Sequence, residues 1–373
     1  MKVVIVNCFD TYEDRIDLLH DFFSNKFYDV TVIQSDFRHF KKIKRIESKQ
    51  NFIFVESKPY YKNMSVARLS SHYRYAKKAF QTVEDLNPDL LYVMAPPNSL
   101  VKFAAKYKRK HKNVKLIFDI MDLWPETMPL GKVEILPPFN FWRLMRDRNV
   151  RFADYVITEC DLYQEVLKNV LKGIKTKTIY LAKREVNVVS NPKLSKDEIN
   201  LCYLGSINNI IDIPSIKRIV KSINEFKPVV LHIIGDGEKK ETLIDEIKST
   251  GAVVEYYGKI YDPQKKQDIF DKCHFGLNIM KETVCVGLTM KSIDYFQGGL
   301  PIINTIKADT AEFVDKYKIG INIFDGNMKN EDIKIVTTEI QKIIIMRKNT
   351  CRLFSSLFSV KAFNEKLQSI GEL

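Results

Sequence analysis

The stretch Gly287-Leu-Thr-Met-Lys-Ser-Ile-Asp-Tyr-Phe-Gln-Gly-Gly-Leu-Pro-Ile-Ile-Asn304 decides the fold of this chain. Residues 291–297 predict a short helix, the Gly-Gly pair ends it, and residues 300–304 form an apolar run typical of a buried strand. Residues 275–280 predict a second buried strand upstream. The unit is therefore a βαβ crossover. Its first loop lies at the C-terminal edge of a parallel sheet, where open α/β folds bind their ligands.

Two side chains in this stretch indicate the chemistry of a ligand. Lys291 falls in the first turn of the helix, whose free N–H groups favour an anion. Asp294 follows one turn later, and its carboxylate can accept hydrogen bonds from sugar hydroxyls. The residues alone predict a phosphate next to a sugar. A nucleotide fits this description, and so do other anions.

Three further strands in this half of the chain end in glycine. They lead into Gly205-Ser206, into Gly235-Asp236-Gly237 and into Gly258-Lys259. Glycine at such a turn lets the backbone approach a phosphate closely.

Taken in order, these motifs resemble the donor domain of family 4 glycosyltransferases of the GT-B fold. The resemblance implies that Asp294 holds a ribose, and that Lys291 meets a diphosphate together with the amides of Thr289 and Met290. It also implies that the donor site includes Gly205, Ser206, Gly235, Asp236 and Gly237. Two positions depart from the family. Val286 stands where the family carries a glutamate, and no lysine follows Gly205, so Lys291 or Lys281 is expected to supply that charge.

A second informative stretch, Asp119-Ile-Met-Asp-Leu-Trp-Pro-Glu126, follows a predicted central strand. Asp122 is the candidate catalytic residue, as a general base or as a group that orients an acceptor, because an apolar neighbour raises the pKa of a carboxyl. Trp124 and Asp119 are candidate acceptor contacts, although a helix cap is the favoured interpretation of Asp119. The segment resembles the Asp-Leu-Trp-Pro-Glu of family 4 enzymes that build bacterial surface polysaccharides. Many of these relatives have histidine where this chain has Met121.

The loop after the first strand supplies two more candidate acceptor contacts, Asp10 and Arg15. A helix cap or a surface ion pair is the alternative for each. The loop lacks the Gly-x-Gly-x-x-Gly of a dinucleotide site, which disfavours an NAD enzyme.

Composition narrows the class of protein. A chain of 373 residues with 45% hydrophobic and 28% charged residues predicts a globular enzyme of two domains. The six cysteines show no Cys-x-x-Cys spacing, which predicts reduced thiols, no metal site and a cytoplasmic location. The net charge of +13 is concentrated in residues 38–49 and 101–118. These clusters are either solvated surface or a peripheral contact with the anionic inner face of the cell membrane. No nucleic-acid-binding motif accompanies them.

We therefore expect an α/β protein of the GT-B type, with two Rossmann-like domains that face each other across a cleft. Residues 1–185 are expected to form the acceptor-side domain and residues 197–350 the nucleotide-sugar domain, with a linker over residues 183–196. A helix is expected at residues 332–346. The amphipathic segment 354–373 is expected to be a C-terminal helix that crosses back to the first domain.

The predicted function is a hexosyltransferase that moves a sugar from a UDP-, GDP- or dTDP-sugar to a lipid-linked saccharide in capsule or exopolysaccharide assembly. The resemblance implies that the anomeric configuration is retained and that no metal or other cofactor is needed. Two alternatives stay open. One is a GT-B-fold partner subunit of another transferase, without activity of its own, and the other is a sugar-nucleotide 2-epimerase.

Overall fold

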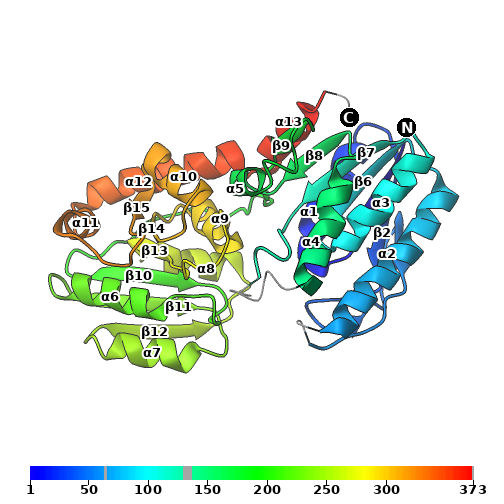
Figure 1. The fold of residues 1–373 in the computed structure, drawn as a ribbon. Helices are drawn as coiled ribbons and strands as arrows, with labels where there is room; N and C mark the ends of the chain where they lie inside the picture. The colour runs from blue at the N-terminus through cyan, green and yellow to red at the C-terminus, as the bar shows by residue number, and fades with distance from the viewer. Residues whose placement is uncertain (63–64, 129–136, 372–373) are drawn as a thin grey trace. The chain divides into compact units, whose positions relative to one another are not determined.

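The computed structural model describes residues 1–62, 65–128 and 137–371, and the chain divides into two compact units. Unit 1 comprises Met1–Leu181 with Lys366–Leu373, and unit 2 comprises Ala182–Glu365. Each unit is built on a parallel sheet with helices on both faces (Figure 1).

The sheet of unit 1 has seven strands in the order β5-β2-β1-β6-β7-β8-β9. They are β1 (Lys2–Asn7), β2 (Asp29–Ser35), β5 (Phe52–Val55), β6 (Leu90–Ala95), β7 (Lys115–Ile120), β8 (Tyr155–Thr158) and β9 (Thr176–Thr178). A small antiparallel pair, β3 (Phe37–Arg38) and β4 (Ile43–Lys44), follows β2. The strand order reverses between β1 and β6, so the carboxyl ends of these two strands form the switch point of the sheet.

From β1 the chain adds strands first on one side of the sheet and then on the other. Right-handed crossovers in these two directions place the helices of unit 1 on both faces of the sheet. They are α1 (Glu13–Ser24), α2 (Val66–Leu86), α3 (Asn98–Lys110), α4 (Pro137–Val150) and α5 (Asp161–Val166), with a 3-10 turn η1 (Asp10–Tyr12) before α1. Helices α2, α3 and α4 lie side by side on one face, and α1 lies on the other (Figure 1).

The sheet of unit 2 has six strands in the order β12-β11-β10-β13-β14-β15. They are β10 (Ile199–Leu204), β11 (Val229–Ile234), β12 (Val253–Gly258), β13 (Phe275–Asn278), β14 (Ile302–Asn304) and β15 (Gly320–Asn322). Its helices are α6 (Ile213–Asn224), α7 (Lys240–Lys248), α8 (Pro263–Phe270), α9 (Met290–Gln297), α10 (Asp309–Tyr317), α11 (Asn330–Val336) and α12 (Ile340–Leu357). The last helix, α13 (Val360–Gln368), contains residues of both units.

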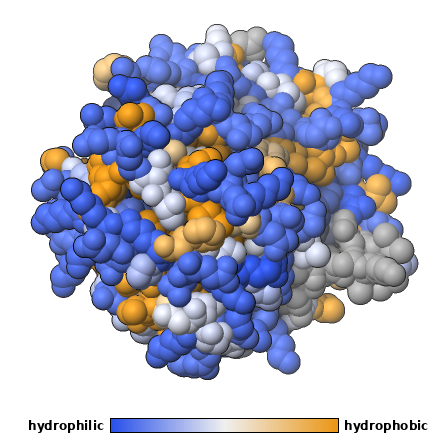
Figure 2. Space-filling model, turned by 90° about the vertical axis from the view of Figure 1, so that its left-hand side faces the viewer, coloured by the Kyte–Doolittle hydropathy of each residue, from blue (hydrophilic) through white to orange (hydrophobic). Residues whose placement is uncertain are grey.

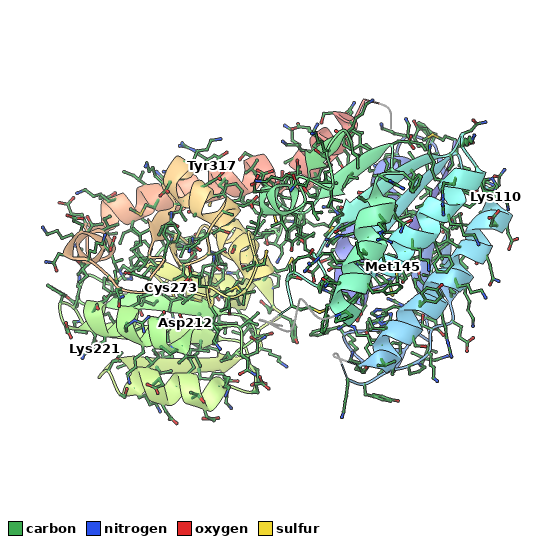
Figure 3. All side chains as sticks on the ribbon, viewed as in Figure 1. Lys110, Met145, Asp212, Lys221, Cys273 and Tyr317 are labelled. Atoms are coloured by element: carbon green, nitrogen blue, oxygen red, sulfur yellow. The ribbon has the colours of Figure 1, made fainter. Side chains whose placement is uncertain are left out.

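The apolar runs of the sequence explain why the central strands are where they are. β6 and β11 are buried at every position, as strands covered by helices on both faces must be. In unit 2 the side chains of β10, β11 and β13 pack with α6 and α7 into one hydrophobic cluster. α6 begins at its cap Asp212, whose carboxylate accepts the N–H of Ser215 at 3.1 Å (Figure 3).

The predicted βαβ unit is confirmed. The helix α9 begins after Thr289 and ends at Gly298, and Gly299 has a φ of 64°. A Cβ at Gly299 would lie 2.6 Å from the sulfur of Cys351, so this turn needs glycine for its backbone and for its space.

The predicted helix over residues 332–346 and the terminal helix over 354–373 were wrong in their bounds. The structure has α11, α12 and α13 instead, with breaks at residues 337–339 and 358–359. At the second break, the carbonyl of Phe358 accepts the N–H of Lys183 at 2.9 Å and Ser359 forms a bridge with Lys183. A hydrogen bond from far away in the sequence therefore interrupts the helical pattern.

Two helices of unit 1 also differ from what the sequence predicts. The prolines at residues 137 and 138 predict a loop over residues 134–139, but α4 already begins at Pro137. Residues 134–136 of that loop lie outside the described residues. α3 was not predicted, and most of the basic cluster of residues 101–118 lies on it, where Lys108 pairs with Asp154 at 2.7 Å and Lys110 with Glu84 at 2.9 Å.

Within the described residues, no helix is both long and apolar enough to cross a membrane. Figure 2 shows one face of the molecule, on which small hydrophobic areas are separated by hydrophilic side chains. Exposed apolar residues of unit 2, such as Phe226 and Tyr261, are of this scattered kind, which is ordinary for a protein surface.

Candidate functional site

The site in unit 2 begins with two glycine loops that follow β10 and β11. The backbones of these loops touch. A Cβ on Gly235 would lie 1.9 Å from the carbonyl oxygen of Gly205, and one on Gly237 would lie 2.2 Å from that of Ile207. Gly205 and Gly235 also have φ values of 118° and 149°. Gly235 and Gly237 must therefore be glycine chiefly because the two loops are in contact. This contact brings the ends of β10 and β11 together at the edge of the sheet.

Ser206 and Asp236 stabilise these loops. The carbonyl of Ser206 accepts the hydroxyl of Tyr203 at 2.9 Å. The carboxylate of Asp236 is exposed and accepts the N–H of Gly237 at 2.9 Å. The second carboxylate oxygen of Asp236 lies 3.9 Å from the ammonium of Lys259. The hydroxyl of Ser206 takes part in neither contact and can bind a ligand.

Helix α9 presents its N-terminus at the end of β13. The side chain of Thr289 accepts the N–H of Ser292 at 3.2 Å and thereby caps the helix. The first N–H groups of a helix have no partner within it, and the cap satisfies only one of them. The amides of Met290 and Lys291 have no partner within the helix and can bind an anion. From the sequence, the amides of Thr289 and Met290 were expected in this role, and that assignment stays a prediction.

Lys291 lies partly buried against the first glycine loop. Its Cδ is 3.9 Å from the place where a Cβ on Gly205 would stand, and its ammonium is 5.1 Å from the ring centroid of Tyr203. In the described part of the chain no carboxylate forms an ion pair with Lys291. Loss of solvent lowers the pKa of the Lys291 ammonium to about 7. An anion beside this group would supply the missing counter-charge.

Asp294 lies one turn further along α9, on the same face as Lys291. Lys183 binds one carboxylate oxygen of Asp294 at 2.8 Å, and Lys266 binds the other at 2.7 Å. Burial alone would raise the pKa of Asp294, but the charges of the two lysines outweigh it, and the pKa is lowered. Asp294 is therefore an ionised acceptor fixed from both sides.

Lys266 was not predicted as a site residue. It lies on α8, which carries no motif, and only the fold brings it to Asp294. Lys183 is the first residue of the predicted linker, and the structure places its ammonium on the carboxylate that was expected to bind ribose.

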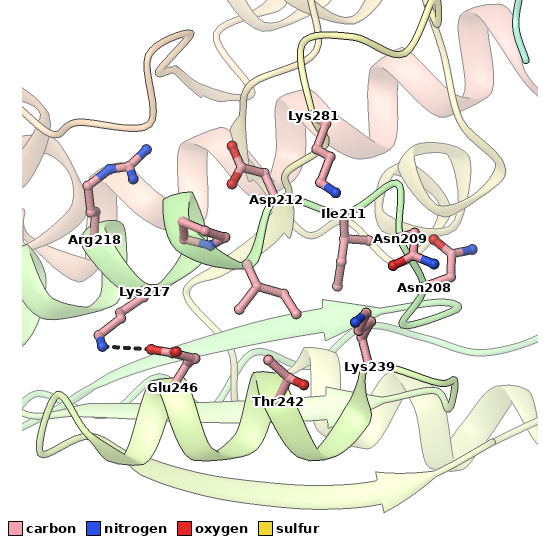
Figure 4. A pocket seen from close by; sticks show the side chains of 12 residues that line it. Asn208, Asn209, Ile211, Asp212, Lys217, Arg218, Lys239, Thr242, Glu246 and Lys281 are labelled. Atoms are coloured by element: carbon pink, nitrogen blue, oxygen red, sulfur yellow. Dashed lines mark hydrogen bonds and ion pairs between the residues drawn. The ribbon is translucent and has the colours of Figure 1, made fainter. Parts of the chain in front are cut away.

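Lys281, the other candidate for the diphosphate, lies elsewhere in unit 2. It lines a pocket of about 470 Å³ between α6 and α7, together with Asn208, Asn209, Ile211, Asp212, Ile213, Pro214, Lys217, Arg218, Lys239, Thr242 and Glu246 (Figure 4). Lys217 and Glu246 form an ion pair of 2.6 Å there. Neither Lys291 nor Asp294 lines this pocket. Because Lys291 shares α9 with Asp294 and Lys281 does not, we prefer Lys291 as the lysine that binds the diphosphate.

In unit 1, Asp122 lies in the loop after β7 and is held by its own segment. One carboxylate oxygen accepts the indole N–H of Trp124 at 2.6 Å, and the other accepts the hydroxyl of Thr127. Burial raises the pKa of Asp122, and these two hydrogen bonds oppose the rise. A partly buried carboxyl with a raised pKa is suited to proton transfer or to orienting a hydroxyl.

Arg15 and Asp119 form a buried ion pair. Arg15 Nε lies 2.7 Å from one carboxylate oxygen of Asp119 and Nη2 lies 3.1 Å from the other, while Tyr92 donates to the same carboxylate at 2.6 Å. The exposed fractions are 2% for Arg15 and 0% for Asp119. This burial points to a role in stability. We therefore leave both residues out of the site that we propose below, although the sequence placed them among the acceptor contacts.

Asp10 and Trp124, the other two predicted acceptor contacts, have different surroundings. Asp10 accepts the N–H of Phe40 at 2.9 Å, so its carboxylate holds the loop after β3. Trp124 packs edge-on against Phe9 with ring centroids 5.3 Å apart, and the guanidinium of Arg68 lies 4.2 Å from its centroid. Trp124 is 8% exposed, so most of its ring packs inside unit 1.

No protein-family model matches the chain, and no curated protein matches its sequence. Solved structures match it over its whole length. Sucrose-phosphate synthase from Thermosynechococcus elongatus has a TM-score of 0.69 at 13% identity, over 100% of this chain and 98% of that one. The lipopolysaccharide outer core galactosyltransferase WaaB has a TM-score of 0.68 at 14% identity, and Anabaena HepE in complex with UDP-glucose 0.67 at 16%, both over 100% of either chain. The chain therefore has the GT-B fold.

Proposed function

We propose that this protein is a glycosyltransferase that binds a nucleotide sugar at α9 and transfers its hexosyl group to a saccharide acceptor. The observation that carries the proposal is the charge around α9. Lys183 and Lys266 both bind the carboxylate of Asp294, and Lys291, one turn earlier on the same helix, pairs with no acid of the described chain. The lysines therefore outnumber the carboxylate, and the negative diphosphate of a nucleotide sugar would balance their charge.

Each group has a distinct proposed role. Asp294 accepts hydrogen bonds from the ribose hydroxyls, because each carboxylate oxygen has lone pairs beyond those that its lysine uses. Lys291 and the first amides of α9 bind the diphosphate. As the glycosidic bond breaks, negative charge grows on the departing diphosphate, and fixed cations and amides stabilise it without reorganisation.

The finer features of the proposal come from the sequence resemblance and from the fold neighbours. HepE was solved with UDP-glucose and WaaB is named as a lipopolysaccharide galactosyltransferase, which supports a UDP-hexose donor and a saccharide acceptor in surface polysaccharide assembly. We propose a lipid-linked acceptor, retention of configuration and peripheral contact of the basic clusters with an anionic membrane. In unit 1 we propose that Asp122 acts on the acceptor hydroxyl and that Trp124 packs against the acceptor sugar.

Thermal unfolding in the presence of nucleotides tests the donor site. UDP, GDP, dTDP and their glucose derivatives are each added to wild type and to Asp294→Asn. A ligand at 100 times its Kd stabilises a protein by about 2.7 kcal/mol, which is readily measured. We expect one nucleotide class to raise the Tm of wild type and to raise that of Asp294→Asn much less. Asp268→Asn, an exposed aspartate on α8, is the matched control and should respond as wild type does.

A second measurement separates an enzyme from a partner subunit. Release of the free nucleotide diphosphate from the stabilising sugar nucleotide is followed with and without membrane extract as the source of acceptor. Release that Asp122→Asn abolishes supports the transferase. Binding without any release favours the partner-subunit alternative, and no binding at millimolar concentration contradicts the donor site itself.

A further inference from the structure

Three side chains that can bind metals meet in unit 1, next to Trp124, whose ring stacks on that of His72 with centroids 6.1 Å apart. None of the three is among the residues to which we assign sugar transfer. Cys8 directly follows β1, His39 directly follows β3, and His72 lies on α2. Their exposed fractions are 1%, 3% and 2%. One ligand atom from each lies within 4.8 Å of the other two. The sequence predicted no metal site because the cysteines are scattered, yet the fold brings together three segments that are far apart in the chain.

The hydrogen bonds of this cluster leave one ring nitrogen unused. His39 Nε2 lies 3.3 Å from Cys8 Sγ, and the Tyr60 hydroxyl lies 2.9 Å from His39 Nδ1 and 3.3 Å from His72 Nε2. His72 Nδ1 is buried and has no hydrogen-bond partner among the described residues. A buried polar atom without a partner costs about 1–3 kcal/mol, so this nitrogen indicates that the cluster is incomplete as it stands.

The geometry suits a small tetrahedral ion. With Zn–S near 2.3 Å and Zn–N near 2.0–2.1 Å, tetrahedral ligand atoms lie about 3.3–3.6 Å apart. The Cys8–His39 distance of 3.3 Å already falls in this range. The limit of 4.8 Å on the other pairs leaves at most about 1.5 Å to close, which a rotation of the His72 ring can supply.

The protonation states are also compatible with metal binding. Burial, with the charge of Arg68 as the next cause, lowers the pKa of His39 to about 3. Burial, with His39 as the next cause, also lowers the pKa of His72. Both imidazoles are therefore neutral at pH 7, which is the form that binds a metal. Burial raises the pKa of the Cys8 thiol, so the metal must displace the thiol proton, which passes to solvent as the metal–sulfur bond forms. The resulting thiolate offsets one of the two positive charges of the ion, and an anionic fourth ligand such as hydroxide or chloride would offset the other.

We propose that Cys8, His39 and His72 form a binding site for one Zn²⁺ or a similar divalent ion that prefers thiolate and imidazole. The site has three protein ligands and an open fourth position. It fastens the loops after β1 and β3 to α2, and the proposal does not depend on glycosyl transfer. Hard cations such as Mg²⁺ are not expected to bind, because the cluster offers no carboxylate.

Cobalt substitution tests the site. The full-length protein is stripped with a chelator, checked for folding by circular dichroism, and titrated with Co²⁺. We expect a thiolate-to-cobalt charge-transfer band that saturates at one ion per chain and that Zn²⁺ removes. Cys8→Ser should lose the band. Cys160→Ser should keep it, because Cys160 is also a buried thiol of unit 1 but lies outside the cluster.

His72→Gln provides a second variant in case Cys8→Ser does not fold. It should weaken Co²⁺ binding at least tenfold and leave the charge-transfer band in place, since the thiolate remains. The inference is overturned if folded wild type shows no band, if Cys8→Ser retains it, or if Cys160→Ser loses it equally.

Discussion

Replacing Lys291 with methionine should stabilise the protein and at the same time abolish nucleotide binding. The ammonium lies partly buried against Gly205 and Tyr203, and within the described residues it has no acid to pair with. Methionine fills a similar volume without a charge. The variant therefore removes the cost of burying the cation and also removes the group that we propose to bind the diphosphate.

The magnitude follows from the pKa of Lys291. A fall from the ordinary 10.5 to about 7 corresponds to about 5 kcal/mol between the protonation states. Because the side chain keeps some contact with solvent and the unit can relax, that value is an upper bound. We expect Lys291→Met to raise the free energy of unfolding by at least about 1 kcal/mol. For a unit of this size, each kcal/mol raises the Tm by about 2–4 °C.

The lowered pKa of Lys291 also determines how the stability difference between Lys291→Met and wild type changes with pH. Between the folded pKa of about 7 and the ordinary 10.5, the unfolded chain binds a proton that the folded chain does not. The stability of wild type should therefore rise with pH across this window, and the cost is fully present below pH 7. Lys291→Met lacks this rise, so its advantage over wild type should be largest near pH 6.5 and should shrink toward pH 10.

Urea unfolding at pH 6.5, 8 and 9.5 measures both effects. Lys265→Met, an exposed lysine on α8, serves as the control and should show neither the gain in stability nor its pH dependence. If Lys291→Met is less stable than wild type at pH 6.5, or if its advantage does not change with pH, Lys291 is not a cation held at a cost. The argument for a diphosphate at this position then loses its energetic basis.

Three other predictions follow from the described contacts. The affinity for the nucleotide sugar, measured by calorimetry, should fall by up to about tenfold per pH unit above pH 7, because binding then requires Lys291 to take up a proton; an affinity that does not change with pH would contradict this. Asp119→Asn should lower the free energy of unfolding by about 3–5 kcal/mol, since it leaves Arg15 buried without its partner, and should not change nucleotide affinity in folded protein. Gly235→Ala should prevent folding of unit 2 or abolish nucleotide binding, because its Cβ would lie 1.9 Å from a carbonyl oxygen. Gly258→Ala is the control: the nearest atom to its Cβ is 4.0 Å away, so it should lower the free energy of unfolding only by the roughly 1–2 kcal/mol of a left-handed backbone. Circular dichroism and urea unfolding measure both effects.

The sequence predicted the parts of the fold that depend on local pattern. The central strands of both sheets, such as β6 and β11, appear as short apolar runs, whereas β9 is the polar sequence Thr-Lys-Thr. The glycine pair after residue 297 correctly marks the end of α9. The helix was predicted to begin at Lys291, and α9 begins one residue earlier, at Met290, after its N-cap Thr289. Such signals extend over a few residues, so a single sequence contains them.

Contacts between distant residues were not predictable in this way. Lys266 approaches Asp294 only because β12 and β13 lie on opposite sides of β10 and β11 in the sheet. The partner of Arg15 is 104 residues away, and nothing in the loop of Arg15 indicates that it is buried. Cys8 and His39 likewise meet only through the pairing of β1 with β2. The topology of the sheet determines these pairs, and periodicity carries no information about it.

Lys291 differs from the buried arginines of this protein, and this difference supports the assignment of the anion site to unit 2. Arg347 of unit 2 is buried but is paired with Asp271 at 3.1 Å. In unit 1 the buried guanidinium of Arg15 has a carboxylate and two carbonyl oxygens as partners, so its charge is satisfied within the protein. In unit 2, Lys291 is partly buried with an aromatic ring as its neighbour and no acid of the described chain as its partner. A cost of this kind is not required by the fold, since methionine would pack in its place. Residues that destabilise the free protein are characteristic of positions whose partner is a ligand. The charge that Lys291 lacks is the charge that a diphosphate carries.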